Sequence, residues 1–100
     1  MKGKCQIMSM AMWNKDYFDM IEPAYISFNN KDEGILVFGC ISARLTCSLT
    51  TTDVDFTFEG QDEMEATSGE GWAELQPDGS LEGEISFQNG DETSFTATKW

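Results

Sequence analysis

The sequence predicts a mainly β protein, a small antiparallel up-and-down barrel or half-barrel of seven or eight strands with one short helix. Apolar and polar residues alternate almost everywhere after residue 24, and this period of two is typical of half-buried strands. Turn residues separate the alternating runs, so consecutive strands are expected to pair antiparallel. Closing such a meander removes exposed strand edges, and a two-sheet β-sandwich of the same strands is the alternative.

The N-terminal part is expected to hold a less regular strand within residues 4–12, followed by a helix at residues 15–21. Four apolar residues there fall at helical spacing: Trp13, Tyr17, Met20 and Ile21. Asn14 is the expected N-cap and Pro23 closes the run. The apolar stripe predicts a helix that packs across the sheet or caps one end of the barrel.

The middle of the chain predicts a strand at residues 24–29 and an apolar run at residues 35–49. The second half of that run is apolar on one face, whereas Leu36 and Phe38 make the first half apolar on both. Because the pattern changes near Gly39 and glycine tolerates a kinked backbone, a bend or bulge is expected there.

The C-terminal half predicts four more strands, at residues 53–59, 71–76, 81–88 and 93–99. Three connectors have turn chemistry: a polar loop at residues 50–52, Pro77 to Gly79, and Asn89 with Gly90. No linker or repeat interrupts the pattern, so residues 1–100 are expected to form a single β domain.

The net charge of the chain limits the classes of molecule that it is expected to bind. The chain has 18 acidic and 6 basic residues, a net charge of −12, and 40% hydrophobic residues. Binding of nucleic acid or anionic membranes needs clustered Lys and Arg, so neither is expected. An acidic surface suits a basic protein partner or divalent cations, although it also serves solubility alone.

Three cysteines, Cys5, Cys40 and Cys47, are an odd number in a chain large enough to fold without disulfides. No secretory signal pattern and no apolar run of membrane-spanning length stands in the sequence. These observations favour a cytoplasmic location.

The most unusual segment is residues 59–72, with five carboxylates, three glycines and one tryptophan. It is expected to be a loop, and hard oxygen donors in a glycine-rich loop suit a cation. The candidate metal ligands are Asp62, Glu63, Glu65 and Glu70. Their spacing matches no EF-hand, and acidity that only maintains solubility is the alternative.

Three aromatic residues are candidate ligand-binding residues: Trp13, Tyr17 and Trp72. They could line the mouth of the barrel, where ligand pockets commonly open, and hold a small apolar or amphipathic molecule. Packing of large rings in the core is the alternative.

Catalysis has little support, because the chain has no His to serve as general base. The cysteines lack CxxC spacing, and Cys47 lies on the apolar parity of its strand, which predicts a buried and inert thiol. We therefore expect no enzyme, no catalytic residue and no cofactor.

Two short elements carry a resemblance that extends over nearly the whole chain: Gly-Gln-Asp-Glu-Met at residues 60–64 and Gly-x-Gly-Trp-Ala at residues 69–73. The sequence resembles a family of small uncharacterised bacterial β proteins, which implies a bacterial cytosolic protein and carries over no site residues. It departs from that family's pattern at Glu70, where a basic residue is usual, and at Gln88, where a His is usual. A remoter likeness to calycins, the lipocalin-type barrels, rests on architecture alone.

The leading functional hypothesis is a non-enzymatic small-molecule-binding or interaction module. The first alternative is an acidic protein that binds and neutralises a basic protein partner. The second alternative is a carboxylate-based cation site or enzyme. Each is compatible with a monomer or a homodimer.

Overall fold

Eight strands and one short helix make up the described chain. A computed structural model of the protein describes residues 3–29, 32–62 and 65–99. The elements follow the chain in this order: β1 (Gly3–Met10), α1 (Lys15–Phe18), β2 (Tyr25–Phe28), β3 (Glu33–Phe38), β4 (Ile41–Leu49), β5 (Asp53–Asp62), β6 (Glu65–Leu75), β7 (Leu81–Phe87) and β8 (Glu92–Lys99).

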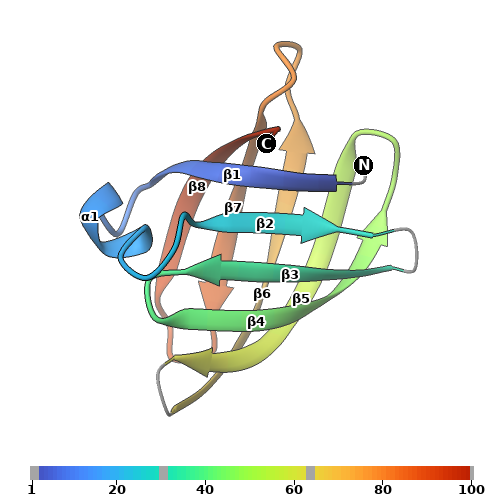
Figure 1. Cartoon of the computed structure of the whole chain (residues 1–100). Coiled ribbons are helices and arrows are strands. Elements are labelled where there is room, and N and C mark those ends of the chain that lie inside the picture. The colour runs from blue at the N-terminus through green and yellow to red at the C-terminus, as the bar shows by residue number, and fades with distance from the viewer. Residues whose placement is uncertain (1–2, 30–31, 63–64, 100) are drawn as a thin grey trace.

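Every strand pairs antiparallel with its neighbour in sequence, and β8 returns to pair with β1, so the sheet is a closed barrel (Figure 1). The register at the closing seam shifts between Ile7 and Ser9, where β1 contains an irregularity opposite β8. Closure confirms the predicted barrel and contradicts both the half-barrel and the two-sheet sandwich.

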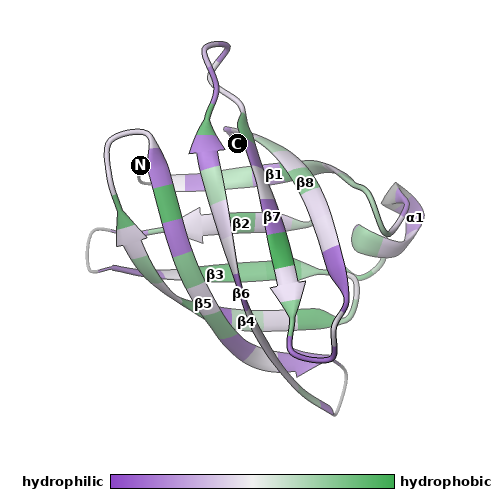
Figure 2. Cartoon of the chain, turned by 180° about the vertical axis from the view of Figure 1, so that it is seen from behind, coloured by the Kyte–Doolittle hydropathy of each residue, from purple (hydrophilic) through white to green (hydrophobic). Residues whose placement is uncertain are grey.

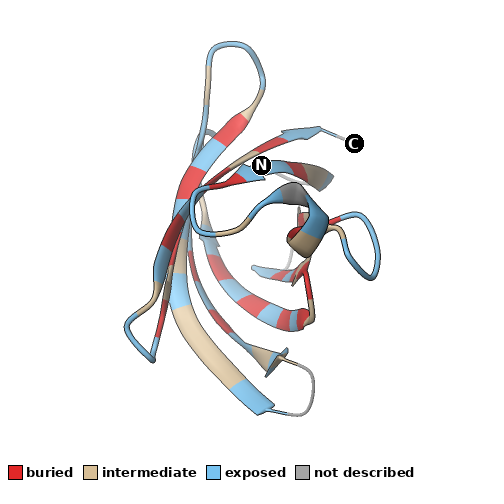
Figure 3. Ribbon diagram, turned by 90° about the vertical axis from the view of Figure 1, so that its left-hand side faces the viewer, coloured by how far each residue is buried: buried red, intermediate tan, exposed pale blue. Residues whose placement is uncertain are grey.

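Alternate residues of each strand point into the barrel, which gives the banded pattern of buried and exposed positions in Figure 3. All seven phenylalanines of the chain are buried. They share the interior with aliphatic residues such as Ile7, Leu36 and Ile85, which have no exposed surface. An eight-stranded barrel has an interior just wide enough for side chains to fill, and here large rings occupy it.

The predicted bend at Gly39 is a full reversal of the chain. β3 ends at Phe38, which pairs with Ile41 at the start of β4, so Gly39 and Cys40 form a two-residue hairpin loop. Gly39 has φ of 54°, as the first residue of such a turn requires. The residues that point into the barrel have even numbers in β3 and odd numbers in β4. This change explains why residues 35–49 have apolar residues at both even and odd positions.

The helix is shorter than predicted and buries a different residue. Asn14 caps it as expected, because the Tyr17 N–H donates to the Asn14 side-chain oxygen at 3.1 Å. The carbonyl of Phe18 accepts from the Gly39 N–H at 2.8 Å, a bond that ties the end of the helix to the β3–β4 hairpin. Phe18 is 1% exposed, whereas Met20 and Ile21 are 54% and 67% exposed, so the predicted stripe is wrong at its C-terminal end.

The segment at residues 59–72 is not a loop. Its described residues continue β5 as far as Asp62 and start β6 at Glu65, and the two strands form a long hairpin. Gly69 and Gly71 pair with Phe58 and Phe56, whose rings cover these glycines inside the barrel. The glycines therefore make room for core aromatics.

Candidate functional site: the outer face around Trp72

Trp13 and Tyr17 come together at the end of the barrel that α1 covers. Their rings stack with centroids 5.7 Å apart. Trp13 also lies 5.3 Å from the Phe38 ring and 5.9 Å from the Phe87 ring, and Phe87 lies 5.3 Å from Phe58. Both residues are half-buried against the core, so the contacts described for these rings are packing contacts.

The Trp72 side chain lies on the outer surface of the barrel, whereas Trp13 and Tyr17 pack against the core. It is 42% exposed, while the next residue, Ala73, is 1% exposed and faces the core. Because neighbouring residues of a strand point to opposite faces, Trp72 points outward from β6. The structure therefore corrects the predicted grouping of three rings: Trp13 and Tyr17 lie together, and Trp72 lies apart from them.

Carboxylates occupy all four outward positions that adjoin Trp72: Glu70 and Glu74 along β6, Asp55 on β5 and Glu84 on β7. Direct cross-strand partners have Cβ atoms about 4.5–5.5 Å apart. Two further carboxylates flank Glu74 across the sheet, Asp53 on β5 and Glu82 on β7. We call these six carboxylates and Trp72 the Trp72 face, which lies within the strands at the front of Figure 2.

All six carboxylates of the Trp72 face are exposed. Asp53, Glu74 and Glu82 stand directly opposite one another across three strands, and like charges in such positions destabilise a sheet by roughly 0.2–1 kcal/mol per pair. The fold gains nothing from this repulsion. The arrangement instead creates a concentrated negative potential around an exposed indole ring.

The excess of acidic residues lies in the second half of the chain, and the barrel places the strands of that half on one side of the molecule. Residues 1–44 carry five acidic and five basic residues, whereas residues 45–98 carry thirteen acidic residues and neither Lys nor Arg. The strands β5 to β8 are contiguous in the closed sheet, so the net charge lies on their side of the molecule. This one-sided distribution was present in the sequence and identifies the face that residue-by-residue reading missed.

A hollow of about 560 Å³ lies over the Trp72 face. Its outward lining consists of Trp72, three carboxylates and hydroxyl groups: Asp55, Glu70, Glu84, Thr46, Ser48, Thr57 and Ser86. The hollow thus combines an aromatic surface, negative charge and hydrogen-bonding groups, which together suit an organic cation.

The predicted metal ligands do not converge among the residues that the structure describes. Asp62 and Glu65 pair at the β5–β6 hairpin, while Glu70 belongs to the Trp72 face, and Glu63 lies outside the described residues. Within the described ranges, no three His, Cys, Asp or Glu side chains are placed to hold a metal ion.

The three cysteines are free thiols, and Cys47 is buried as its parity predicted. Burial, with a smaller contribution from the negative charge of Asp32, raises the pKa of Cys47 from 9.0 to about 11. Burial also raises the pKa of Cys5, against a weaker opposite effect of Lys99. A raised pKa lowers the thiolate fraction, so neither group is activated as a nucleophile.

Comparisons of the chain with protein-family models, curated proteins and solved structures find no match. The family resemblance described above therefore stays a prediction. In the part of the chain that the structure describes, no helix has the length and apolar character needed to span a membrane.

Proposed function

We propose that this protein is a non-enzymatic interaction module that binds a positively charged protein partner through the Trp72 face. The observation that carries the proposal is the arrangement around Trp72, where each of the four adjoining outward positions holds a carboxylate. An exposed aromatic ring within a negative field matches the chemistry of an Arg or Lys side chain.

Two energetic terms support a cationic partner. A cation placed over an indole ring gains about 0.5–2 kcal/mol, depending on how far the pair is desolvated. The six carboxylates add long-range attraction, which accelerates encounter and orients a basic surface before contact. No Lys or Arg lies between residues 45 and 98 to offset that attraction.

The geometry favours several cationic groups over one metal ion. Asp55 and Glu84 lie on either side of Trp72, on strands two spacings apart, so their backbones are separated by about 10 Å. Ligands of Ca²⁺ must approach one ion within about 2.3–2.6 Å. Charges spread over three strands therefore suit a partner that presents a cationic surface of similar width.

The test is calorimetric titration with triarginine amide as a cationic probe at about 0.1 M salt, where the Debye length is about 10 Å. The triple variant D55N/E70Q/E84Q removes three charges beside Trp72, and we expect it to weaken binding about tenfold, or ~1.4 kcal/mol. The variant W72A removes the aromatic surface and is expected to weaken binding by a smaller factor, because cation–π attraction at an exposed site is modest.

The matched control is D16N/E22Q/D32N, which makes the same change in net charge at exposed positions outside the Trp72 face and its hollow. It is expected to change the affinity less than about twofold, because distant charges are screened. Equal losses in both triple variants would show that the probe responds to net charge alone, and the proposed face would be abandoned.

A further inference from the structure

The outer surface next to the Trp72 face is hollowed as well. A second hollow of about 1370 Å³ extends over β3 to β7. It shares four lining residues with the hollow at Trp72: Thr46, Thr57, Glu70 and Ser86. The two hollows are therefore continuous, and a chain anchored at Trp72 passes directly into the larger one.

The chemistry changes along this groove. Beyond the shared residues, its outward side chains combine four neutral hydrogen-bonding groups with two apolar and three charged residues: Ser42, Gln61, Ser68, Gln88, Ile35, Ala66, Glu33, Arg44 and Glu59. The row at its far end is uncharged, because Ser42 pairs with Gln61 and Gln61 with Ala66. The Ser68 hydroxyl donates to the Gln88 side-chain oxygen at 2.7 Å, which joins β6 to the residue after β7 on this wall. Arg44 stands directly opposite Glu59, so this pair adds no net charge.

The length of the groove follows from the register of β4. Ser48 lies in the same cross-strand row as Asp55 and Trp72, and Ser42 lies six residues earlier on the same outward face. Six residues of strand extend about 20 Å, which is also the length of an extended peptide of about six residues. The groove thus runs from an acidic, aromatic end to a neutral, polar end over the span of a short peptide.

We propose that the partner enters this groove as an extended segment of about six residues, with Arg or Lys at Trp72 and neutral polar residues toward Ser42. The inference rests on the proposed function and adds the form in which the partner binds. An extended chain exposes backbone N–H and C=O groups along its length, whereas a helix satisfies its own. Hydroxyl and amide side chains lining the neutral part can bind such groups.

The experiment compares triarginine amide with two longer peptides, in which Ser-Gly-Ser-Gly-Ser-Gly follows or precedes the three arginines. At least one tailed peptide is expected to bind about tenfold more tightly than triarginine amide, because only one direction aligns with the groove. The variant S42W fills the neutral end at an exposed strand position, where an aromatic residue is well tolerated. We expect S42W to abolish the gain from the tail and to leave the binding of triarginine amide unchanged.

The matched control is T98W, an equally large change at an exposed position of β8 that lines neither hollow, and it should keep the full gain. A tail that adds no affinity in either direction, or a gain that survives in S42W, overturns the groove while leaving the Trp72 face in place. Failure of triarginine amide to bind at all overturns the proposed function and this inference together. Thermal melting of both variants verifies that each one folds.

Discussion

Three glycines in the C-terminal half stand opposite phenylalanines on neighbouring strands. Gly71 pairs with Phe56, Gly69 with Phe58 and Phe87, and Gly83 with Phe95. At each glycine the absence of a side chain leaves space that the ring of a partner fills. These glycines are thus part of the core packing.

The change Gly71→Ala tests this packing. A Cβ at Gly71 would lie 2.6 Å from Cζ of Phe56 and 2.5 Å from the Glu84 carbonyl oxygen, so the ring and the neighbouring strand must move. Overpacking of a core costs about 1–3 kcal/mol, and we expect a loss of this size in urea denaturation. Ser48→Ala on the outer face is the control and should change stability by less than about 0.5 kcal/mol. A neutral effect of Gly71→Ala would mean that the hairpin adapts to the added methyl group.

The raised pKa of Cys47 predicts that the folded protein loses stability as the pH rises into the alkaline range. Its pKa is raised from 9.0 to about 11 in the folded protein, so the folded state retains the thiol proton after the unfolded state has lost it. The contribution is complete below pH 9.0 and decreases as the pH rises toward about 11. We expect the melting temperature to fall across this window more steeply in the wild type than in Cys47→Ala. Parallel curves would contradict the assignment.

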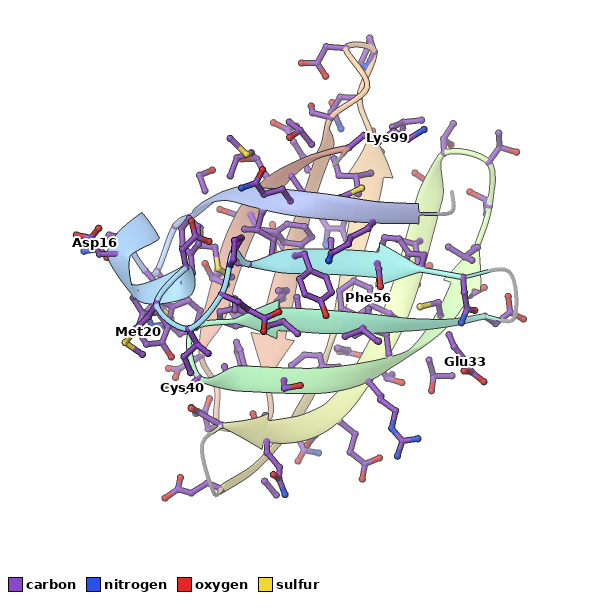
Figure 4. The ribbon with its side chains drawn as sticks, viewed as in Figure 1. Asp16, Met20, Glu33, Cys40, Phe56 and Lys99 are labelled. Atoms are coloured by element: carbon purple, nitrogen blue, oxygen red, sulfur yellow. The ribbon has the colours of Figure 1, made fainter. Side chains whose placement is uncertain are left out.

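At the scale of elements, α1 attaches to the barrel end through Tyr17, which is half-buried against the core, and through Phe18. Phe18 is buried, while Met20 and Ile21 are exposed. Side chains labelled in Figure 4 show Met20 and Asp16 on the outer side of this segment. The attachment therefore depends on Phe18, on the bond from the Gly39 N–H to its carbonyl, and on the packing of Tyr17.

Phe18→Ala is expected to destabilise the protein by about 3–5 kcal/mol, the usual cost of removing a buried aromatic ring. Met20→Ala is the control on the same segment and should stay within about 0.5 kcal/mol, because its side chain contributes little to burial. Both changes in unfolding free energy are measured by urea denaturation, with one shared value for the dependence of that free energy on urea concentration. Comparable losses in the two variants would restore the longer apolar helix predicted from spacing.

Three carboxylates stand in one row across β5, β6 and β7, and this row predicts that reversing the charge of its middle residue stabilises the fold. Glu74 stands between Asp53 and Glu82, so Glu74→Lys replaces two repulsive cross-strand pairs with two attractive ones. We expect a gain of about 0.5–1 kcal/mol in unfolding free energy together with weaker binding of triarginine amide. Glu22→Lys makes the same change in net charge in an exposed loop and should do neither to the same extent. A destabilised Glu74→Lys protein would show that the row is not strained electrostatically.

At the scale of the whole molecule, stability and binding should respond to salt in opposite directions. The barrel measures 34 × 25 × 22 Å and carries a net charge of −12. The Debye length falls from about 30 Å at 0.01 M salt to about 10 Å at 0.1 M, so added salt removes repulsion between distant strands. We expect the unfolding free energy to rise over this range while the affinity for triarginine amide falls. If both quantities move together, the charges act through something other than their mutual repulsion.

The local patterns of the sequence were sufficient to predict most of the barrel wall, apart from the hairpin formed by the end of β5 and the start of β6. Alternation located most of the strands, and the connectors at residues 50–52, 77–79 and 89–90 lie between consecutive strands as predicted. These features are local because the side-chain period of a strand and the backbone angles of a turn depend on residues close in sequence. The same locality explains the success of Asn14 as N-cap and of Cys47 as a buried thiol.

Features that depend on residues distant in sequence were decided only by the tertiary structure. Whether residues 59–72 form a loop or a hairpin depended on Phe56 and Phe58 filling the space beside Gly71 and Gly69. The side of the wall on which Trp72 stands depended on the register between β5, β6 and β7, and that register surrounded the ring with carboxylates. The sequence by itself determined an acidic meander of seven or eight strands, and cross-strand register decided which of its charges meet, because pairing joins residues that no local pattern relates.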